Sequence, residues 1–202
     1  IFFAMLRKLL LSPMLYEIII YSFMINKVRE LVKEKCGPEN WDYHISLVVK
    51  YSKLLAKKLG SDEKIAELGA LMHDIGWIVD MKNDPDHEIS GQPIAEQILK
   101  DIGYPQKIID EVKHIIASHR GSTGPKPETI TAKIVANADA MAHFDAIPWF
   151  MQLSLKNHDN DLEKAVNWIY NKIERDWSQK LTLPESKEIV KEKYEAIKLI
   201  LT

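Results

Sequence analysis

Histidine placement is the first chemical signal in this chain. Six of the seven histidines lie between residues 44 and 143. At about 100° per residue, three of them fall on the apolar stripes of separate predicted helices: His44, His87 and His119. His114 points away from the stripe of its helix. A single histidine on an apolar face is usually a core residue with one hydrogen-bond partner. Three buried imidazoles would each need a separate partner. A shared divalent cation would satisfy them together.

Two aspartates extend this set of possible ligands. His73 and Asp74 are adjacent in "LMHDIGWIVD", residues 71 to 80. Side chains of adjacent residues diverge by about 100° on a regular helix, so His73 and Asp74 can both reach one ion only where the helix ends. We expect Gly76 to end it. Asp139 is surrounded by alanines, whose small size lets its helix approach others closely; the alternative is an alanine-rich helix with an exposed aspartate. Imidazole and carboxylate donors favour manganese, iron, nickel, cobalt or zinc over calcium, with magnesium as a further candidate.

The elements that position these residues are all predicted to be helices, and the pattern favours no strand. The expected boundaries are Met24 to Cys36, Asp42 to Leu59, Ser61 or Asp62 to Gly76, Asp86 or Ser90 to Gly103, Pro105 to His119, Pro127 to Phe144, 160 to 178, and 185 to 201. The Gly/Pro-rich stretch at 121–127 is the clearest loop. We therefore predict an all-α fold with a single helical domain over residues 24–202.

Composition is typical of a globular protein of 202 residues, with 46% apolar and 28% charged residues and no Gly/Ser-rich linker. The net charge of −2 argues against a general nucleic-acid or anionic-membrane binder, because neither partner would be attracted electrostatically. The single cysteine, Cys36, excludes a disulfide framework and favours the reducing cytoplasm.

Residues 1–23 are far more apolar than the rest of the chain. Arg7, Lys8, Pro13 and Glu17 divide them into pieces too short to cross a bilayer, which takes about 20 apolar residues in a row. We expect an amphipathic extension that packs on the body or on a second subunit of a homodimer. The alternative is that residues 1–23 are not native, because Met24 also reads as a normal start.

The order His44, then "HDIG" at 73–76, then Asp139 in "NADA", resembles the signature of the HD-domain metal-dependent phosphohydrolases. The resemblance covers residues 40 to 145. It implies an HD-domain helical bundle that holds a divalent metal and hydrolyses a phosphate ester. The implied ligands are His44, His73, Asp74 and Asp139, and Asp74 would also orient the attacking water. Two further histidines, His87 and His119, would hold a weaker second metal or contact the substrate phosphate.

Two positions depart from the two-metal HD-GYP members of that family, which carry a lysine after HDIG and a later His-His pair. Trp77 and Arg120 occupy these places, and the Gly-Tyr-Pro loop is absent, so cyclic-dinucleotide hydrolysis is not predicted. Arg120 is our first choice for binding phosphate and Lys82 the second, against the alternative that each is a solvated surface charge. Trp77 would stack on a base or belong to the core. His143 is placed to line the same pocket.

The sequence as a whole predicts a phosphohydrolase that acts on a small phosphorylated molecule, with a nucleotide as the preferred substrate. A bound divalent ion activates water and polarises a phosphoryl oxygen, so no protein nucleophile is needed. The alternative is a non-catalytic module that binds metal and nucleotide. A single-strand nuclease is a weaker reading, because no basic stripe interleaved with aromatic residues is present and no stable nucleic-acid partner is expected.

Overall fold

The computed structural model describes residues 12–79, 86–121 and 124–201, and within these ranges every regular element is a helix. This confirms the predicted all-α class. The α-helices are α2 (Pro13–Asn40), α3 (Ser46–Leu59), α4 (Glu63–Met72), α5 (Ile75–Val79), α6 (His87–Ile102), α7 (Gln106–Ser118), α8 (Ile130–Asp145), α9 (Ile147–Asn157), α10 (Leu162–Arg175) and α11 (Pro184–Leu201). Two π-helical turns, η1 (Trp41–Ile45) and η2 (Asp176–Lys180), complete the set.

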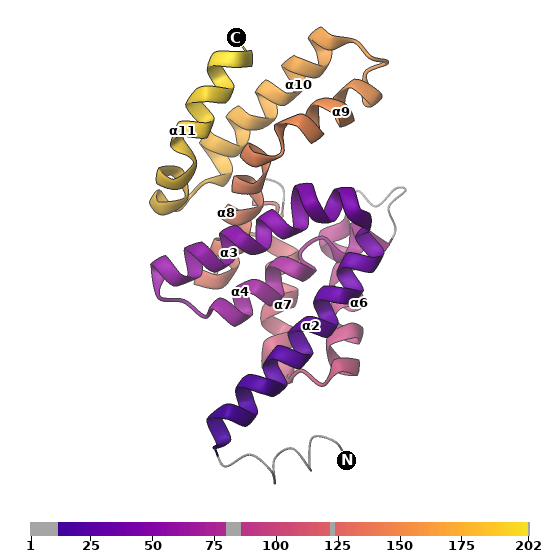
Figure 1. Cartoon of the computed structure of the whole chain (residues 1–202), viewed down its shortest axis with the longest axis vertical. Helices are drawn as coiled ribbons and strands as arrows, with labels where there is room; N and C mark the ends of the chain where they lie inside the picture. Colours follow the sequence, from indigo (N-terminus) through magenta and orange to yellow (C-terminus); the bar gives the residue numbers. More distant parts are fainter. Residues whose placement is uncertain (1–11, 80–85, 122–123, 202) are drawn as a thin grey trace.

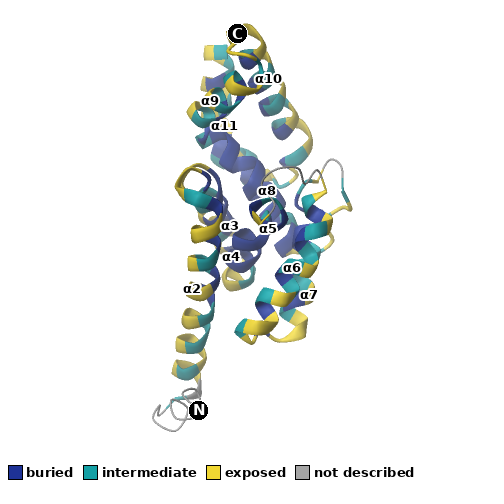
Figure 2. Cartoon of the chain, turned by 90° about the vertical axis from the view of Figure 1, so that its right-hand side faces the viewer, coloured by how far each residue is buried: buried dark blue, intermediate teal, exposed yellow. Residues whose placement is uncertain are grey.

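Helix α8 is the central helix of the fold and packs against α3, α4, α7 and α11. It joins the group formed by α2, α3, α4, α6 and α7 to a second layer of α9, α10 and α11 (Figure 1). It is buried along almost its whole length (Figure 2), and α3 and α4 lie against it. Its alanines, among them Ala138, Ala140 and Ala142, are fully buried and leave room for this close approach. The alanine-rich segment is therefore an interior helix, as one of the two readings predicted.

Most predicted helix ends are confirmed. Gly60 and Gly103 end α3 and α6 in the left-handed conformation, with φ of 66° and 100°. Asp62 caps α4 by accepting hydrogen bonds from the backbone of Lys64 and Ile65. Gly37 interrupts α2 with a φ of 73°, which agrees with the predicted stop after Cys36.

Several helices differ from the prediction, and the first helix, α2, already begins at Pro13 rather than at Met24. Helix α4 ends at Met72, so His73 and Asp74 themselves form the turn, and Gly76 lies inside the following helix α5. A Cβ on Gly76 would lie 2.5 Å from the His87 carbonyl oxygen, so this glycine is needed for close contact between α5 and α6. Helix α8 begins at Ile130 behind a Thr129 cap rather than at Pro127. Helix α9 was not predicted.

Residues 13–23 form the beginning of α2 and leave several large apolar side chains exposed, including Met14, Ile18 and Phe23. Across the described ranges, no helix combines the length and hydropathy needed to cross a bilayer. Residues 1–11 of the predicted extension lie outside the described residues, and so does Lys82.

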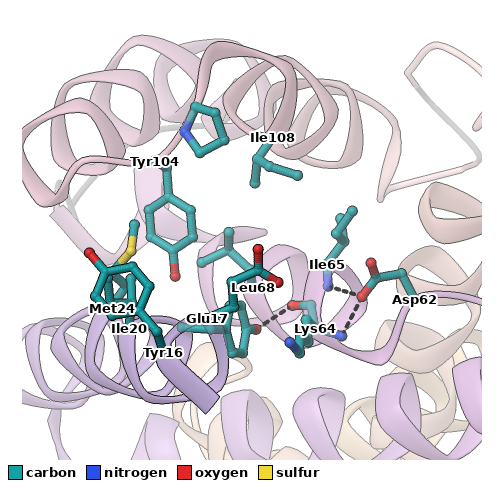
Figure 3. A pocket seen from close by; sticks show the side chains of 12 residues that line it. Tyr16, Glu17, Ile20, Met24, Asp62, Lys64, Ile65, Leu68, Tyr104 and Ile108 are labelled. Carbon is teal, nitrogen blue, oxygen red and sulfur yellow. Dashed lines mark hydrogen bonds between the residues drawn. The ribbon is translucent and has the colours of Figure 1, made fainter. Parts of the chain in front are cut away.

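An apolar cavity of about 290 Å³ lies between the first half of α2 and the beginnings of α4 and α7 (Figure 3). The Tyr21 hydroxyl, on one wall, donates a hydrogen bond to the Lys64 carbonyl at 2.8 Å. Tyr104 on another wall is 7% exposed, and its buried hydroxyl has no hydrogen-bond partner among the described residues. Burial also raises the pKa of this hydroxyl, which stays neutral.

Tyr104→Phe removes a buried hydroxyl that has no partner, so we expect the free energy of unfolding to stay within about 0.5 kcal/mol of wild type or to increase. The matched control is Tyr51→Phe, because the Tyr51 hydroxyl donates to Asp145 at 2.7 Å and accepts from Lys193 at 2.9 Å. That change should cost about 1.5–3 kcal/mol. Urea unfolding of both variants checks this, and a large loss for Tyr104→Phe would contradict it.

Candidate metal centre

Helices α4 and α7 each present an imidazole from the residue that follows their last turn. His73 donates from Nδ1 to the Ala70 carbonyl at 2.7 Å, and His119 donates from Nδ1 to the Ile116 carbonyl at 2.7 Å. Carbonyls in the last turn of a helix lack an intrahelical partner, so these bonds satisfy them. Because a carbonyl only accepts, Nδ1 carries the proton, and in the neutral ring Nε2 offers a lone pair to the site.

Asp74 lies between two pairs of histidines. Its Oδ2 atom is 3.0 Å from Nε2 of His44 and 3.3 Å from Nε2 of His73. Its Oδ1 atom is 3.3 Å from Nε2 of both His87 and His119. The two carboxylate oxygens therefore face two different sets of imidazole nitrogens.

Asp139, on α8, adds a second carboxylate beside His44 and His73. Its Oδ1 atom lies 3.6 Å from Nε2 of His44, 4.0 Å from Nε2 of His73 and 3.4 Å from Nε2 of His143. Two groups of possible ligand atoms result, each with all its atoms within 4.8 Å of one another: His44, His73 and Asp139, and Asp74, His87 and His119. All six residues that the sequence suggested as ligands are brought together.

The donor atoms fit divalent cations. The Nε2 atoms of His44 and His73 are 3.2 Å apart, and those of His87 and His119 are also 3.2 Å apart. Two imidazole lone pairs at this distance repel unless a proton or a metal ion lies between them. Imidazole nitrogen with carboxylate oxygen is a donor set that suits zinc, manganese, iron, cobalt and nickel.

Charge at the centre is balanced between the carboxylates and the nearby cations. Burial would lower the pKa of His73, but the Asp74 carboxylate outweighs it and raises that pKa to about 9. Burial raises the pKa of Asp74, yet the histidines around it hold it well below its usual range. The pKa of Asp139 is likewise low, because Lys180 and the neighbouring histidines overcome the effect of burial. Both carboxyls are therefore anions, as metal ligands must be.

Side chains from α10 and η2 contact Asp139 and His143 from behind, and the sequence does not predict that these two elements reach the site. Lys180 binds Oδ2 of Asp139 at 3.0 Å, and the fully buried Asp176 accepts from Nδ1 of His143 at 2.7 Å. Lys172 lies 3.4 Å from the same Asp176 oxygen. Burial and the Lys172 charge lower the pKa of His143 to about 4, which keeps its imidazole neutral. Nothing in the local sequence signals these contacts, because lysines on amphipathic helices are usually solvated.

Two adjoining cavities open on the centre. A cationic cavity of about 260 Å³ is lined by all the candidate ligands except His73, and by His143, Arg120, Lys172, Arg175 and Lys180. An aromatic cavity of about 180 Å³ is lined by Asn40, Trp77, Trp149 and Phe150, and it shares His44, Asp74, His87 and His143 with the first. Arg120 lines the cationic cavity, with its guanidinium held by both oxygens of Glu88 at 3.0 and 3.1 Å.

Comparison with known families and structures agrees with this geometry. The HD domain model matches residues 41–143, a range that contains every histidine and aspartate of the two ligand groups. The chain therefore belongs to the HD-domain family, whose members bind divalent metals. The family resemblance noted in the sequence is confirmed.

Two solved structures share the fold. Bacillus subtilis YpgQ in complex with ADP superposes with a TM-score of 0.68 at 21% identity, covering 90% of this chain and 93% of that one. A predicted HD superfamily hydrolase from an uncultured Thermotogales bacterium gives 0.59 at 22% identity, covering 89% and 88%.

Curated relatives at higher identity are much longer proteins. Ribonuclease Y from Bacillus thuringiensis strain Al Hakam is 33% identical over 137 residues, and that from Listeria welshimeri is 32% identical over the same length. Each alignment covers 67% of this chain, but the chain spans only 24% of the length of these relatives.

Metal content should separate the two ligand groups. We expect wild-type protein to hold one ion in each group, Asp139→Ala to lose the ion of the first group, and His119→Ala to lose that of the second. Asp74→Ala should lower both, because its oxygens face both groups. Elemental analysis of each variant gives the number of metal ions bound per chain.

The control is His114→Ala. His114 accepts a hydrogen bond from the Glu128 backbone and lies outside both ligand groups. Its metal content should match wild type; equal losses in His114→Ala and Asp139→Ala would contradict the assignment.

Proposed function

We propose that this chain is a metal-dependent phosphohydrolase that acts on a small phosphorylated molecule, with a nucleotide as its substrate class. One observation carries the proposal: the cationic cavity opens on both ligand groups and continues into an aromatic cavity through four shared residues. Anionic phosphate and a flat apolar base would each find a matching surface within the length of one small molecule.

Side chains on the cationic cavity would bind the phosphate. Charge builds up on phosphate oxygens as the bond breaks, and fixed cations in a cavity shielded from water stabilise it. Arg120 offers a planar fork that Glu88 already orients, which limits the rotational freedom lost on binding. Lys172 and Arg175, both on α10, also line this cavity.

The two ligand groups would hold the metal, and Asp74 has one carboxylate oxygen facing the imidazoles of each group. When bound, such an ion activates water at neutral pH and polarises the phosphoryl oxygen. Asp74 is anionic and central, which suits it both to ligate and to accept a hydrogen bond from the attacking water. His87 and His119 approach the second Asp74 oxygen, which favours a second metal over direct phosphate contact for this pair.

The nucleotide part of the proposal is supported by the aromatic walls. Trp149 and Phe150 lie with ring centroids 5.2 Å apart and line the aromatic cavity together with Trp77. Stacking on such rings is worth about 1–3 kcal/mol per base. The ADP in the YpgQ complex belongs to a structural neighbour and is consistent with this class of ligand.

Metal-stripped protein should be assayed for phosphate release from nucleoside mono-, di- and triphosphates after addition of Mn, Ni, Co, Zn or Mg. We expect turnover of at least one class with one of the transition metals. Asp74→Asn keeps the side-chain volume but removes the charge, and activity should fall to background. His114→Ala should keep wild-type rates. Bound metal without turnover of any nucleotide would instead favour the non-catalytic binding module.

A further inference from the structure

We propose that Asn40 recognises the base of the bound nucleotide by hydrogen bonds from its side-chain amide. This inference rests on the proposed function in one respect, because it takes the ligand of the site to be a nucleotide. It goes further by assigning a residue that determines which base is accepted, at a position outside the HD-domain match of residues 41–143.

Asn40 is placed for this role by the kink in α2. Gly37 interrupts the helix, and Asn40 ends it one turn before His44, a predicted metal ligand in η1. The Asn40 side chain is 6% exposed and lines the aromatic cavity beside Trp77 and Trp149. A base that occupies this cavity would therefore lie against the rings and next to the amide.

The amide of Asn40 has no hydrogen-bond partner among the described residues, although both its Oδ1 and Nδ2 atoms are buried. Leaving buried polar atoms without a hydrogen-bond partner destabilises the folded state, so such atoms are few in native proteins and call for an explanation. The cavity beside Asn40 offers one, since a ligand there would supply both missing partners.

Asn137 shows what a structural asparagine in this same chain looks like. It is also buried, at 1% exposed, but its amide donates to Lys133 and Thr182 and accepts from Leu183 and Ser186, at distances of 2.8 to 3.0 Å. Three of these four bonds join α8 to residues 182–186 at the start of α11, and the fourth lies within α8. Asn40 has the same chemistry and similar burial, and none of these bonds.

A side-chain amide is complementary to a nucleobase edge. It presents a donor and an acceptor side by side, and adenine presents the matching acceptor and donor at N7 and N6. The phosphate end of the same molecule would lie in the cationic cavity, because the two cavities share His44, Asp74 and His143. Stacking by the tryptophans accepts any base, so the amide is the group that can discriminate among them.

The test compares binding of AMP, GMP, CMP and UMP with binding of ribose 5-phosphate, by calorimetry in buffer containing Mn²⁺. Wild type should bind at least one of the four nucleotides about tenfold or more tightly than ribose 5-phosphate, the advantage expected from one bidentate pair with stacking. Asn40→Asp keeps the shape but removes the donor, and Asn40→Leu removes both groups. Each should reduce that advantage by about tenfold.

Two controls separate recognition from structure. Asn167→Asp makes the same charge change on the exposed face of α10 and should leave the base preference at its wild-type value. Asn40→Leu should unfold at the same or a higher urea concentration than wild type, because it removes unpartnered atoms. A structural role for Asn40 predicts the opposite, namely a loss of stability with the base preference retained, and that result would overturn the proposal.

Failure of the inference and failure of the proposed function give different results. If wild type hydrolyses nucleotides but both Asn40 variants keep the full base preference, the inference is wrong and the proposed function stands. If wild type binds a nucleotide through its base, loses this in both variants, and hydrolyses none, the inference stands and the chain is a binding module. Equal affinity of wild type for ribose 5-phosphate and all four nucleotides would overturn the inference.

Discussion

The negative charge of Asp74 is the feature around which the centre is organised. A carboxylate that is largely withdrawn from water is very unfavourable unless opposite charges or hydrogen-bond donors surround it. Here four imidazole nitrogens approach its two oxygens at 3.0 to 3.3 Å. Each of those histidines comes from a different segment of the chain, so neutralising one side chain requires η1, α6 and the ends of α4 and α7 to meet.

Glycine and alanine residues allow these segments to pack closely enough for the histidines to reach Asp74. The close contact between Gly76 and Gly91 brings α6 against α5, since a Cβ on either glycine would approach a backbone nitrogen of the other helix at 3.1 Å or less. This contact places His87 beside the turn that carries Asp74. On the opposite side, the buried alanines of α8 bring Asp139 within reach of His44. Small residues thus fix the positions of the charged ones, and any larger side chain there would move a ligand.

Much of this arrangement could be predicted from the sequence, because its signals are local. Apolar stripes gave the inward direction of His44, His87 and His119, and helix-ending glycines such as Gly60 gave the element boundaries. Helix α4 ends before His73, whereas the sequence predicts its end at Gly76, because glycine normally ends a helix. Gly76 instead lies inside α5, where it allows close packing against α6. Long-range contacts were not predictable.

Contacts from the C-terminal helices illustrate that limit. Lys180 lies 41 residues from its partner Asp139, and its sequence neighbourhood resembles any solvated helix face. Helix α9 was missed as well, so the aromatic wall that it supplies could not be foreseen. The unpartnered amide of Asn40 becomes visible only when every donor and acceptor around it is known.

Most of the residues that line the two cavities beside the candidate metal ligands lie outside the range that contains those ligands, although Arg120 and Trp77 lie within it. All six ligand residues lie within residues 41–143, whereas Lys172, Arg175, Trp149 and Phe150 lie beyond that range and Asn40 just before it. Mutations in α9 and α10 can therefore alter the walls of both cavities without touching a ligand. The shape and charge of the two cavities can thus change independently of the candidate ligand groups.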